Sequence, residues 1–70
     1  MMPLTLASRG DCHTVRKVSG DEKMKKHLSD MGIAAGRPLR VISVHGEDVI
    51  VEVASARLAL NGDLAKRIKI

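Results

Sequence analysis

The sequence contains no phenylalanine, tyrosine or tryptophan. Its hydrophobic fraction of 44% is therefore aliphatic side chains, alanine, methionine and one cysteine. A core has to be built from Leu, Ile, Val and Met. The lack of aromatic faces also counts against two classes of binding module, because grooves for proline-rich peptides and platforms for single-stranded nucleic acids both depend on aromatic side chains.

Cysteine is nearly as scarce, since Cys12 is the only one. A single thiol cannot form an intrachain disulfide, and nothing here argues for an oxidising compartment. The sequence also lacks a basic N-terminal segment followed by an apolar run, and no stretch approaches the roughly 18 apolar residues of a membrane span. We therefore expect a soluble cytoplasmic protein.

The chain is short and basic. Its 70 residues are expected to form a single domain, residues 1–70. A domain of this size buries a limited fraction of its surface, so its stability should be modest. The formal net charge of +4 suits an anionic partner, such as nucleic acid, an acidic protein or anionic lipid, but it also suits plain solubility.

Short alternating segments make up the N-terminal part. Residues 3–7 alternate apolar and polar side chains after a proline, which predicts an edge strand. Residues 8–11 have the composition of a turn. Residues 12–18 predict a second strand, with a bulge or a strand end where the spacing from Val15 to Val18 breaks the period of two.

A helix is predicted over about residues 20–31. Ser19 is its expected N-cap. The Ser19 hydroxyl would accept the N–H of Glu22 in a capping box. Gly32 is expected to end the helix in the left-handed conformation, with Ile33 completing a Schellman motif. The apolar face follows helical spacing and consists of Met24, Leu28 and Met31.

The most regular strands lie after the helix. Residues 37–44 and 48–53 predict a β-hairpin, with Gly46 where the turn needs a positive φ. Residues 57–60 alternate as a further short strand.

Two interpretations fit the next dipeptide, Asn61-Gly62. It suits a tight hairpin turn, or a helical turn near residues 62–65 capped by Asn61. Residues 67–70 then predict a closing strand with Ile68 and Ile70 inward. Five or six short strands with one helix inserted after the second strand predict a mostly β fold, a small and partly open antiparallel barrel.

Four side chains of metal-binding type occur: Cys12, His13, His27 and His45. Cys12 and His13 are neighbours that would point to opposite faces of a strand, so they cannot readily share an ion. The spacings CxxC, HxxxH and HExxH are absent. We expect no cofactor and no metal site within one chain, and rank a divalent ion held between two molecules above an intrachain site.

Catalytic motifs are missing as well. The sequence has no spacing that ties Cys12 to a histidine, no glycine-rich phosphate loop and no GxSxG motif. We therefore expect a protein that is not an enzyme.

Lys23, Lys25 and Lys26 form the one concentrated basic patch. A solvated helix face and a docking surface both explain it.

The succession "PLTLA", "DEKMKKHLSDMGIAAG", "LRVISV", "DVIVEV", "RLAL" and "AKRIKI" resembles the FeoA family over nearly the whole chain. The most specific part of this resemblance is the helix exit, formed by Leu28, Met31, Gly32, Ile33 and Gly36. The chain departs from the family pattern at Ala35, where proline is usual, and at Pro38.

The resemblance implies an SH3-like barrel that acts in bacterial ferrous iron transport. It implies a cytoplasmic accessory protein that binds FeoB, the membrane transporter with a GTP-binding domain, at the inner face of the membrane. We place the contact surface on the helix and its exit, where charged side chains would steer association and apolar ones would be buried. The predicted contact residues are Lys23, Lys26, His27, Ile33, Ala34 and Arg37.

Two other functions stay open. A small basic RNA- or ribosome-binding barrel fits the pI near 9.7 and the fold class, although the missing aromatics and the mixed surface charge speak against it. Metal sensing through Cys12 and the histidines is the second. Weak homo-oligomerisation is also left open.

Overall fold

A β-hairpin forms the centre of the fold. In the computed structural model, which describes residues 1–70, strands β3 (Pro38–His45) and β4 (Asp48–Val53) pair antiparallel. Gly46 takes the positive φ, 64°, that the short turn between them needs. The predicted hairpin is confirmed, with β3 shifted by one residue from its expected bounds.

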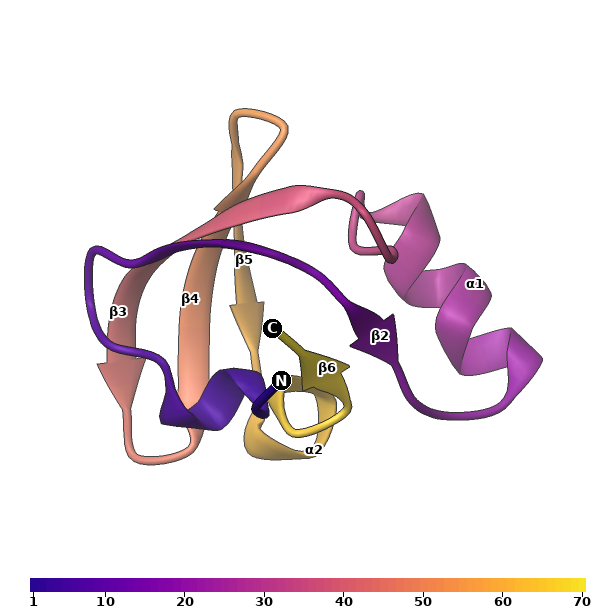
Figure 1. Cartoon of the computed structure of the whole chain (residues 1–70), viewed down its shortest axis with the longest axis horizontal. Coiled ribbons are helices and arrows are strands. Elements are labelled where there is room, and N and C mark those ends of the chain that lie inside the picture. Colours follow the sequence, from indigo (N-terminus) through magenta and orange to yellow (C-terminus); the bar gives the residue numbers. More distant parts are fainter.

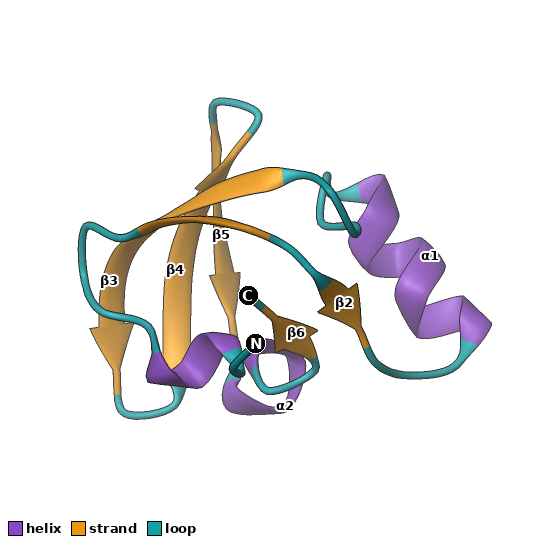
Figure 2. Ribbon diagram, in the orientation of Figure 1, coloured by secondary structure: helices purple, strands orange, loops and turns teal.

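This hairpin lies inside a four-stranded antiparallel sheet of order β1-β3-β4-β5, and a two-stranded sheet pairs β2 with β6 (Figure 1). The other strands are β1 (Cys12–Thr14), β2 (Lys17–Val18), β5 (Ala56–Leu60) and β6 (Ile68–Lys69). The helical segments are the 3-10 turn η1 (Leu4–Leu6), α1 (Glu22–Asp30) and α2 (Gly62–Ala65). Figure 2 shows that strands and loops dominate and that α1 stands to one side of the sheets. The mostly β fold class is confirmed.

β4 contributes strongly to the core because its alternate side chains point inward. Val49 and Val51 are fully buried, and Val53 is 3% exposed. The 14 buried residues form one cluster of aliphatic side chains and alanine, with no buried polar residue among them. The core of this chain, which has no aromatic residues, is therefore made of leucine, isoleucine, valine and alanine.

β1 and β2 are two parts of one bent segment. Val15 lies between them and is buried, with its N–H donating to the carbonyl of Arg37 and its carbonyl accepting from Gly36. These bonds tie the bend to the chain that leaves α1. The predicted interruption near Val15 is confirmed, and it lets the chain leave the larger sheet and join the smaller one.

The predicted strand over residues 3–7 is wrong. The segment forms η1 instead, because the N–H of Leu6 donates to the carbonyl of Pro3 and the N–H of Ala7 to that of Leu4, both at 3.0 Å. These local bonds take the place of a strand ladder. Leu4 is fully buried while Leu6 is 66% exposed. The predicted turn that follows is confirmed by a bond from Asp11 N–H to the Ser8 carbonyl.

The N-cap of α1 is Asp21, so the predicted Ser19 capping box is wrong. The Asp21 carboxylate accepts the N–H of Met24 at 2.8 Å. Ser19 is held outside the helix by its own N–H, which donates to the Arg67 carbonyl. Gly20, with φ 137°, turns the chain between the two positions. Serine and aspartate are both favoured at N-caps, so residue type does not decide between Ser19 and Asp21. The backbone path decides it.

The end of α1 confirms the predicted Schellman motif. Gly32 has φ 91°, its N–H donates to the Ser29 carbonyl, and the N–H of Ile33 donates to the Leu28 carbonyl. Leu28 and Ile33 are both buried. The predicted apolar face is confirmed as well, since Met24 and Met31 pack against the core from partly buried positions.

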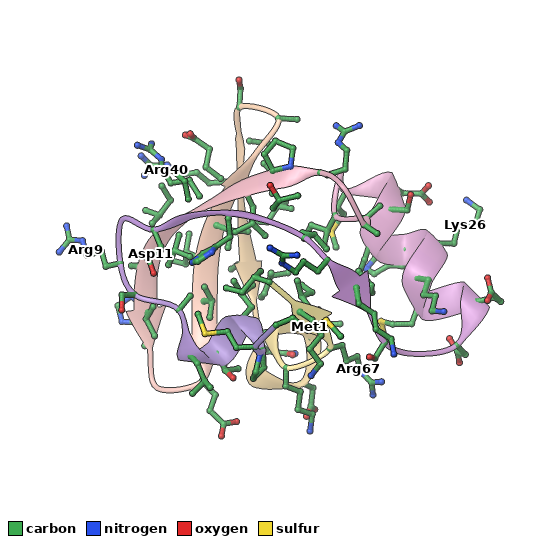
Figure 3. All side chains as sticks on the ribbon, in the orientation of Figure 1. Met1, Arg9, Asp11, Lys26, Arg40 and Arg67 are labelled. Atoms are coloured by element: carbon green, nitrogen blue, oxygen red, sulfur yellow. The ribbon has the colours of Figure 1, made fainter.

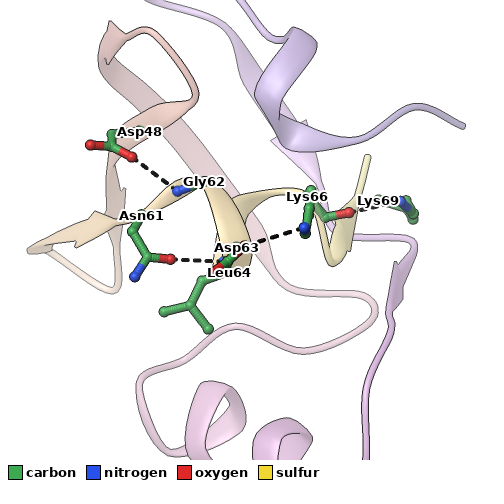
Figure 4. Close-up of polar contacts among 7 residues, drawn as sticks. All are labelled: Asp48, Asn61, Gly62, Asp63, Leu64, Lys66 and Lys69. Carbon is green, nitrogen blue, oxygen red and sulfur yellow. Dashed lines mark hydrogen bonds and ion pairs between the residues drawn. The ribbon is translucent and has the colours of Figure 1, made fainter.

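Of the two interpretations of Asn61-Gly62, the helical turn is confirmed. The side chain of Asn61 accepts the N–H of Leu64 at 3.0 Å, and the Asp48 carboxylate accepts the N–H of Gly62 at 3.0 Å (Figure 4). Lys66 and Asp63 add an exposed ion pair on α2. This short helix is therefore tied at its start to the beginning of β4.

β5 begins at Ala56, one residue before its predicted start. The turn that precedes it consists of Ala54 and Ser55, with φ values of 51° and 67°. Both turn residues therefore adopt the left-handed conformation without being glycine, which leaves no glycine signal in the sequence.

The two ends of the chain are paired with each other. The N–H of Met2 donates to the Ile70 carbonyl at 2.9 Å, and the N–H of Ile70 donates back at 2.8 Å (Figure 1). Ile68 and Ile70 are buried, so the predicted closing strand and its inward face are confirmed. Neither α1 nor α2 has the length and apolar character that a membrane-spanning helix requires.

Candidate functional site

Successive residues on a helix are about 100° apart, so Lys23 and Lys26, three positions apart, lie on one side of α1 and Lys25 lies on another. Lys26 points away from the rest of the molecule (Figure 3), and its Nζ lies 3.1 Å from Oδ2 of Asp30. The Lys26 side chain is 76% exposed, so this ion pair adds little to stability. The basic patch predicted from the sequence is thus divided, with Lys25 on the side of the helix that faces β2 and Lys23 and Lys26 away from it.

Lys23 and His27 share one flank of α1. Together with Asp21 and Met24 they line a shallow hollow of about 270 Å³ near the start of the helix. Both side chains are exposed. These two predicted contact residues are therefore accessible and close to each other.

The exit of α1 divides the remaining predicted residues. Ile33 is 1% exposed and belongs to the core, so it offers almost no surface for a partner to bury. The expectation that Ile33 is an exposed contact is wrong, because the Schellman motif turns it inward. Ala34 is half-buried and Arg37 is exposed. A hydrogen bond from the Arg37 N–H to the Ala34 carbonyl closes the turn between them.

A groove between β2 and α1 brings together residues that the sequence does not place side by side. Arg16 and Lys17 line it from the β1–β2 segment, and Lys25 lines it from α1. Ile33 and Ala34 lie in its floor, and its volume is about 350 Å³. We call these three cations and the floor the basic groove. Arg16 and Lys17 were missed as site residues because their neighbours in sequence give no sign of what faces them.

The side chains of metal-binding type lie on separate elements. Cys12 and His13 are adjacent on β1, His27 is on α1, and His45 ends β3. No group of three histidine, cysteine, aspartate or glutamate side chains comes close enough to hold an ion. The structure thus brings none of the four candidates together with two further ligands.

His13 has one acidic neighbour, Asp11. The His13 Nε2 lies 3.3 Å from Oδ2 of Asp11, and the same oxygen accepts the N–H of Ser8 at 3.0 Å. The Ser8 N–H, with a smaller contribution from His13, lowers the pKa of the Asp11 carboxyl. This cluster fixes the turn that leads into β1.

Comparison with known proteins places the fold and the family. The family model of the FeoA domain matches residues 2–70. No curated protein sequence gives a significant match. Among solved structures, an iron uptake regulatory protein, FeoA, has a TM-score of 0.88 and 28% sequence identity, with 96% of this chain and 91% of that chain covered.

Two further structures show the range of the similarity. FeoA of Stenotrophomonas maltophilia in complex with zinc, described as a prokaryotic SH3 domain protein, has a TM-score of 0.81 at 25% identity and covers 99% of this chain and 88% of that one. A manganese-dependent transcriptional repressor has a TM-score of 0.83 at 28% identity, with 94% of this chain but only 38% of that one covered. The SH3-like fold predicted for the chain is confirmed. With a family match over nearly all of its length, this chain is a member of the FeoA family.

Proposed function

We propose that this protein is a non-enzymatic accessory protein of ferrous iron uptake. It binds and modulates a FeoB-type transporter, a membrane protein with a GTP-binding domain, from the cytoplasmic side of the membrane. Its role is exerted through protein contact, and no reaction is assigned to its own side chains.

The family match over residues 2–70 is the observation that carries this proposal. The similar solved structures support it, because one is an iron uptake regulatory protein and the Stenotrophomonas protein is suggested to activate ferrous iron transport. The resemblance seen in the sequence supplies FeoB as the partner.

The proposed contact surface is α1 and the turn that follows it. Its accessible members are Lys23, Lys26, His27, Ala34 and Arg37. Ile33 no longer belongs among the exposed contacts because it lies in the core. Exposed lysines on a projecting helix would mainly speed association with an acidic surface, since charges at the rim of an interface act on the association rate.

A binding experiment with the purified transporter tests the proposal. FeoB from the same genome is placed in detergent or nanodiscs, and its affinity for this protein is measured by biolayer interferometry. We expect saturable binding that weakens as salt is raised, because screening shortens the reach of exposed charges. The absence of binding at low salt would contradict the proposed function.

Paired charge reversals locate the contact surface. The Lys23→Glu/Lys26→Glu variant changes α1, and the Arg57→Glu/Lys66→Glu variant makes the same change in net charge on β5 and after α2. We expect the first to lower the affinity for FeoB about tenfold more than the second, since like charges across an interface are strongly unfavourable. Equal effects would place the contact elsewhere. Binding to structured RNA or poly(U), without binding to FeoB, would favour the RNA-binding alternative.

A further inference from the structure

β2 and α1 are neighbours in the fold (Figure 1), and residues of both line the basic groove. Val18 of β2, Ile33 and Ala34 form an apolar floor, and Ser29 of α1 adds a hydroxyl. The cations Arg16, Lys17 and Lys25 stand around this floor and are all exposed. The groove thus combines an apolar base with a cationic rim.

The rim cations are left without partners inside the molecule. Arg16, Lys17 and Lys25 form no ion pair and no side-chain hydrogen bond. Only three of the twelve lysines and arginines form an ion pair, which are Lys26 with Asp30, Arg40 with Glu52 and Lys66 with Asp63. The rim cations are therefore set apart by lining one groove together, and not by being unpaired. No carboxylate lines the groove, and no other hollow of the protein is lined by more than one lysine or arginine.

Such an arrangement concentrates positive potential where an apolar group can also be received. A cleft lined by charges of one sign attracts counter-ions more strongly than the same charges on a flat surface. The floor is recessed and small, and its volume of about 350 Å³ is near the lower limit for ligand pockets. These properties match a short segment with one apolar side chain and carboxylates on either side.

The composition of the chain and the burial of the groove floor favour a protein segment over nucleic acid or membrane. Single-stranded nucleic acids are held by aromatic platforms, and this chain has no aromatic residue. Membrane surfaces are met by protruding apolar side chains, whereas the floor residue Ile33 is 1% exposed.

We infer that the basic groove binds an acidic peptide segment of a partner protein, with an apolar side chain of that segment seated on the half-buried Val18 and Ala34. The carboxylates of the segment pair with Arg16, Lys17 and Lys25. Taken with the proposed function, on which this identification rests, the segment belongs to the FeoB-type transporter.

Amide NMR on the isotope-labelled full chain tests the groove directly. The probe is a capped synthetic peptide with one leucine between two pairs of glutamates. Matched peptides carry lysine in place of glutamate, or serine in place of leucine. We expect the acidic leucine peptide to shift the amides of residues 16–18, 25, 29 and 33–35. The lysine peptide should leave them unchanged, and the serine peptide should bind more weakly.

Charge reversal inside and outside the groove provides a matched pair of variants. Lys17→Glu/Lys25→Glu should lower the affinity for the acidic peptide about tenfold, since like charges in contact oppose binding. Arg57→Glu/Lys66→Glu makes the same change in net charge at two residues that line neither the groove nor the proposed contact surface. It should alter the affinity by less than about twofold at roughly 0.15 M salt, where charges farther than about 8 Å are screened.

The outcomes separate this inference from the proposed function. If FeoB binds but the acidic peptide does not shift the groove amides, the inference is wrong and the accessory role stands. If the peptide binds in the groove but FeoB does not bind the protein, the proposed transporter role is wrong and the groove stands. Shifts of the groove amides by poly(U) or by phosphatidylserine vesicles, and not by the peptide, would also overturn the inference.

Discussion

Gly32 and Gly36 have almost the same backbone conformation but very different surroundings. Their φ values are 91° and 89°. A Cβ on Gly32 would lie 2.8 Å from Cγ1 of Val53, while nothing lies within 4 Å of one on Gly36. The first glycine therefore serves both the helix ending and the core, and the second serves only the turn before β3.

Alanine at each position separates these two roles. Gly36→Ala should lower the free energy of unfolding by about 1–2 kcal/mol, the strain of a left-handed L-residue. Gly32→Ala should lower it by that amount and by about 1–3 kcal/mol more, because the added methyl crowds Val53 in a packed core. Urea denaturation of both variants measures the difference. Equal losses in the free energy of unfolding would show that Val53 can move to make room for the methyl group.

Leu28 and Leu6 offer a similar comparison for burial. Leu28 is fully buried, while Leu6 is 66% exposed. Leu28→Ala should lower the free energy of unfolding by about 2–5 kcal/mol, because it leaves a cavity between α1 and the barrel. Leu6→Ala should change it by about 0.5 kcal/mol or less, as is usual for surface positions. A thermal melt of Leu28→Ala at the parent temperature would contradict the packing of α1.

At the scale of the elements, the start of α1 gives the sharpest test. Asp21→Ala should lower the free energy of unfolding by about 1 kcal/mol, because its carboxylate holds the N–H of Met24. Ser19→Ala is the control, since no hydrogen bond of the Ser19 side chain supports the helix. Chemical denaturation followed by circular dichroism compares the two. A larger loss of unfolding free energy for Ser19→Ala than for Asp21→Ala would support Ser19 as the N-cap.

Elements with two agreeing signals could be predicted from the sequence. The β3–β4 hairpin combines strand alternation with a glycine at the turn, and the end of α1 combines a glycine with a matched apolar pair. η1 could not be predicted, because a proline followed by alternating side chains suits an edge strand and a 3-10 turn equally. The cap of α1 depended on the backbone path before the helix, where Gly20 has a φ of 137° and the Ser19 N–H donates to the distant Arg67 carbonyl.

At the scale of the whole molecule, the candidate site was only partly accessible from the sequence. The helix and its exposed lysines were found because they lie within one segment. Arg16 and Lys17 were not, because the bend after β1 and the packing of α1 are what bring them to Lys25. The exposed contact predicted at Ile33 conflicts with the Schellman motif predicted at the same place, in which Ile33 packs against Leu28.

The distribution of potential ligands also predicts how the whole molecule responds to metal removal. No three such side chains lie together, so the folded monomer gains little stability from a bound ion. Treatment with EDTA should therefore leave the unfolding midpoint unchanged at micromolar protein concentration. Calorimetric melts with and without the chelator measure this. A drop of several degrees would reveal an intrachain metal site.

The reciprocal hydrogen bonds between Met2 and Ile70 give the domain a single point of attachment. Both ends leave the barrel at one place, so the domain can be inserted into a surface loop of another protein without forcing that loop apart. The same geometry allows the ends to be joined by a short linker and new ends to be opened at the exposed Ala54–Ser55 turn. Such a circular permutant would present α1 and the basic groove on an unchanged barrel.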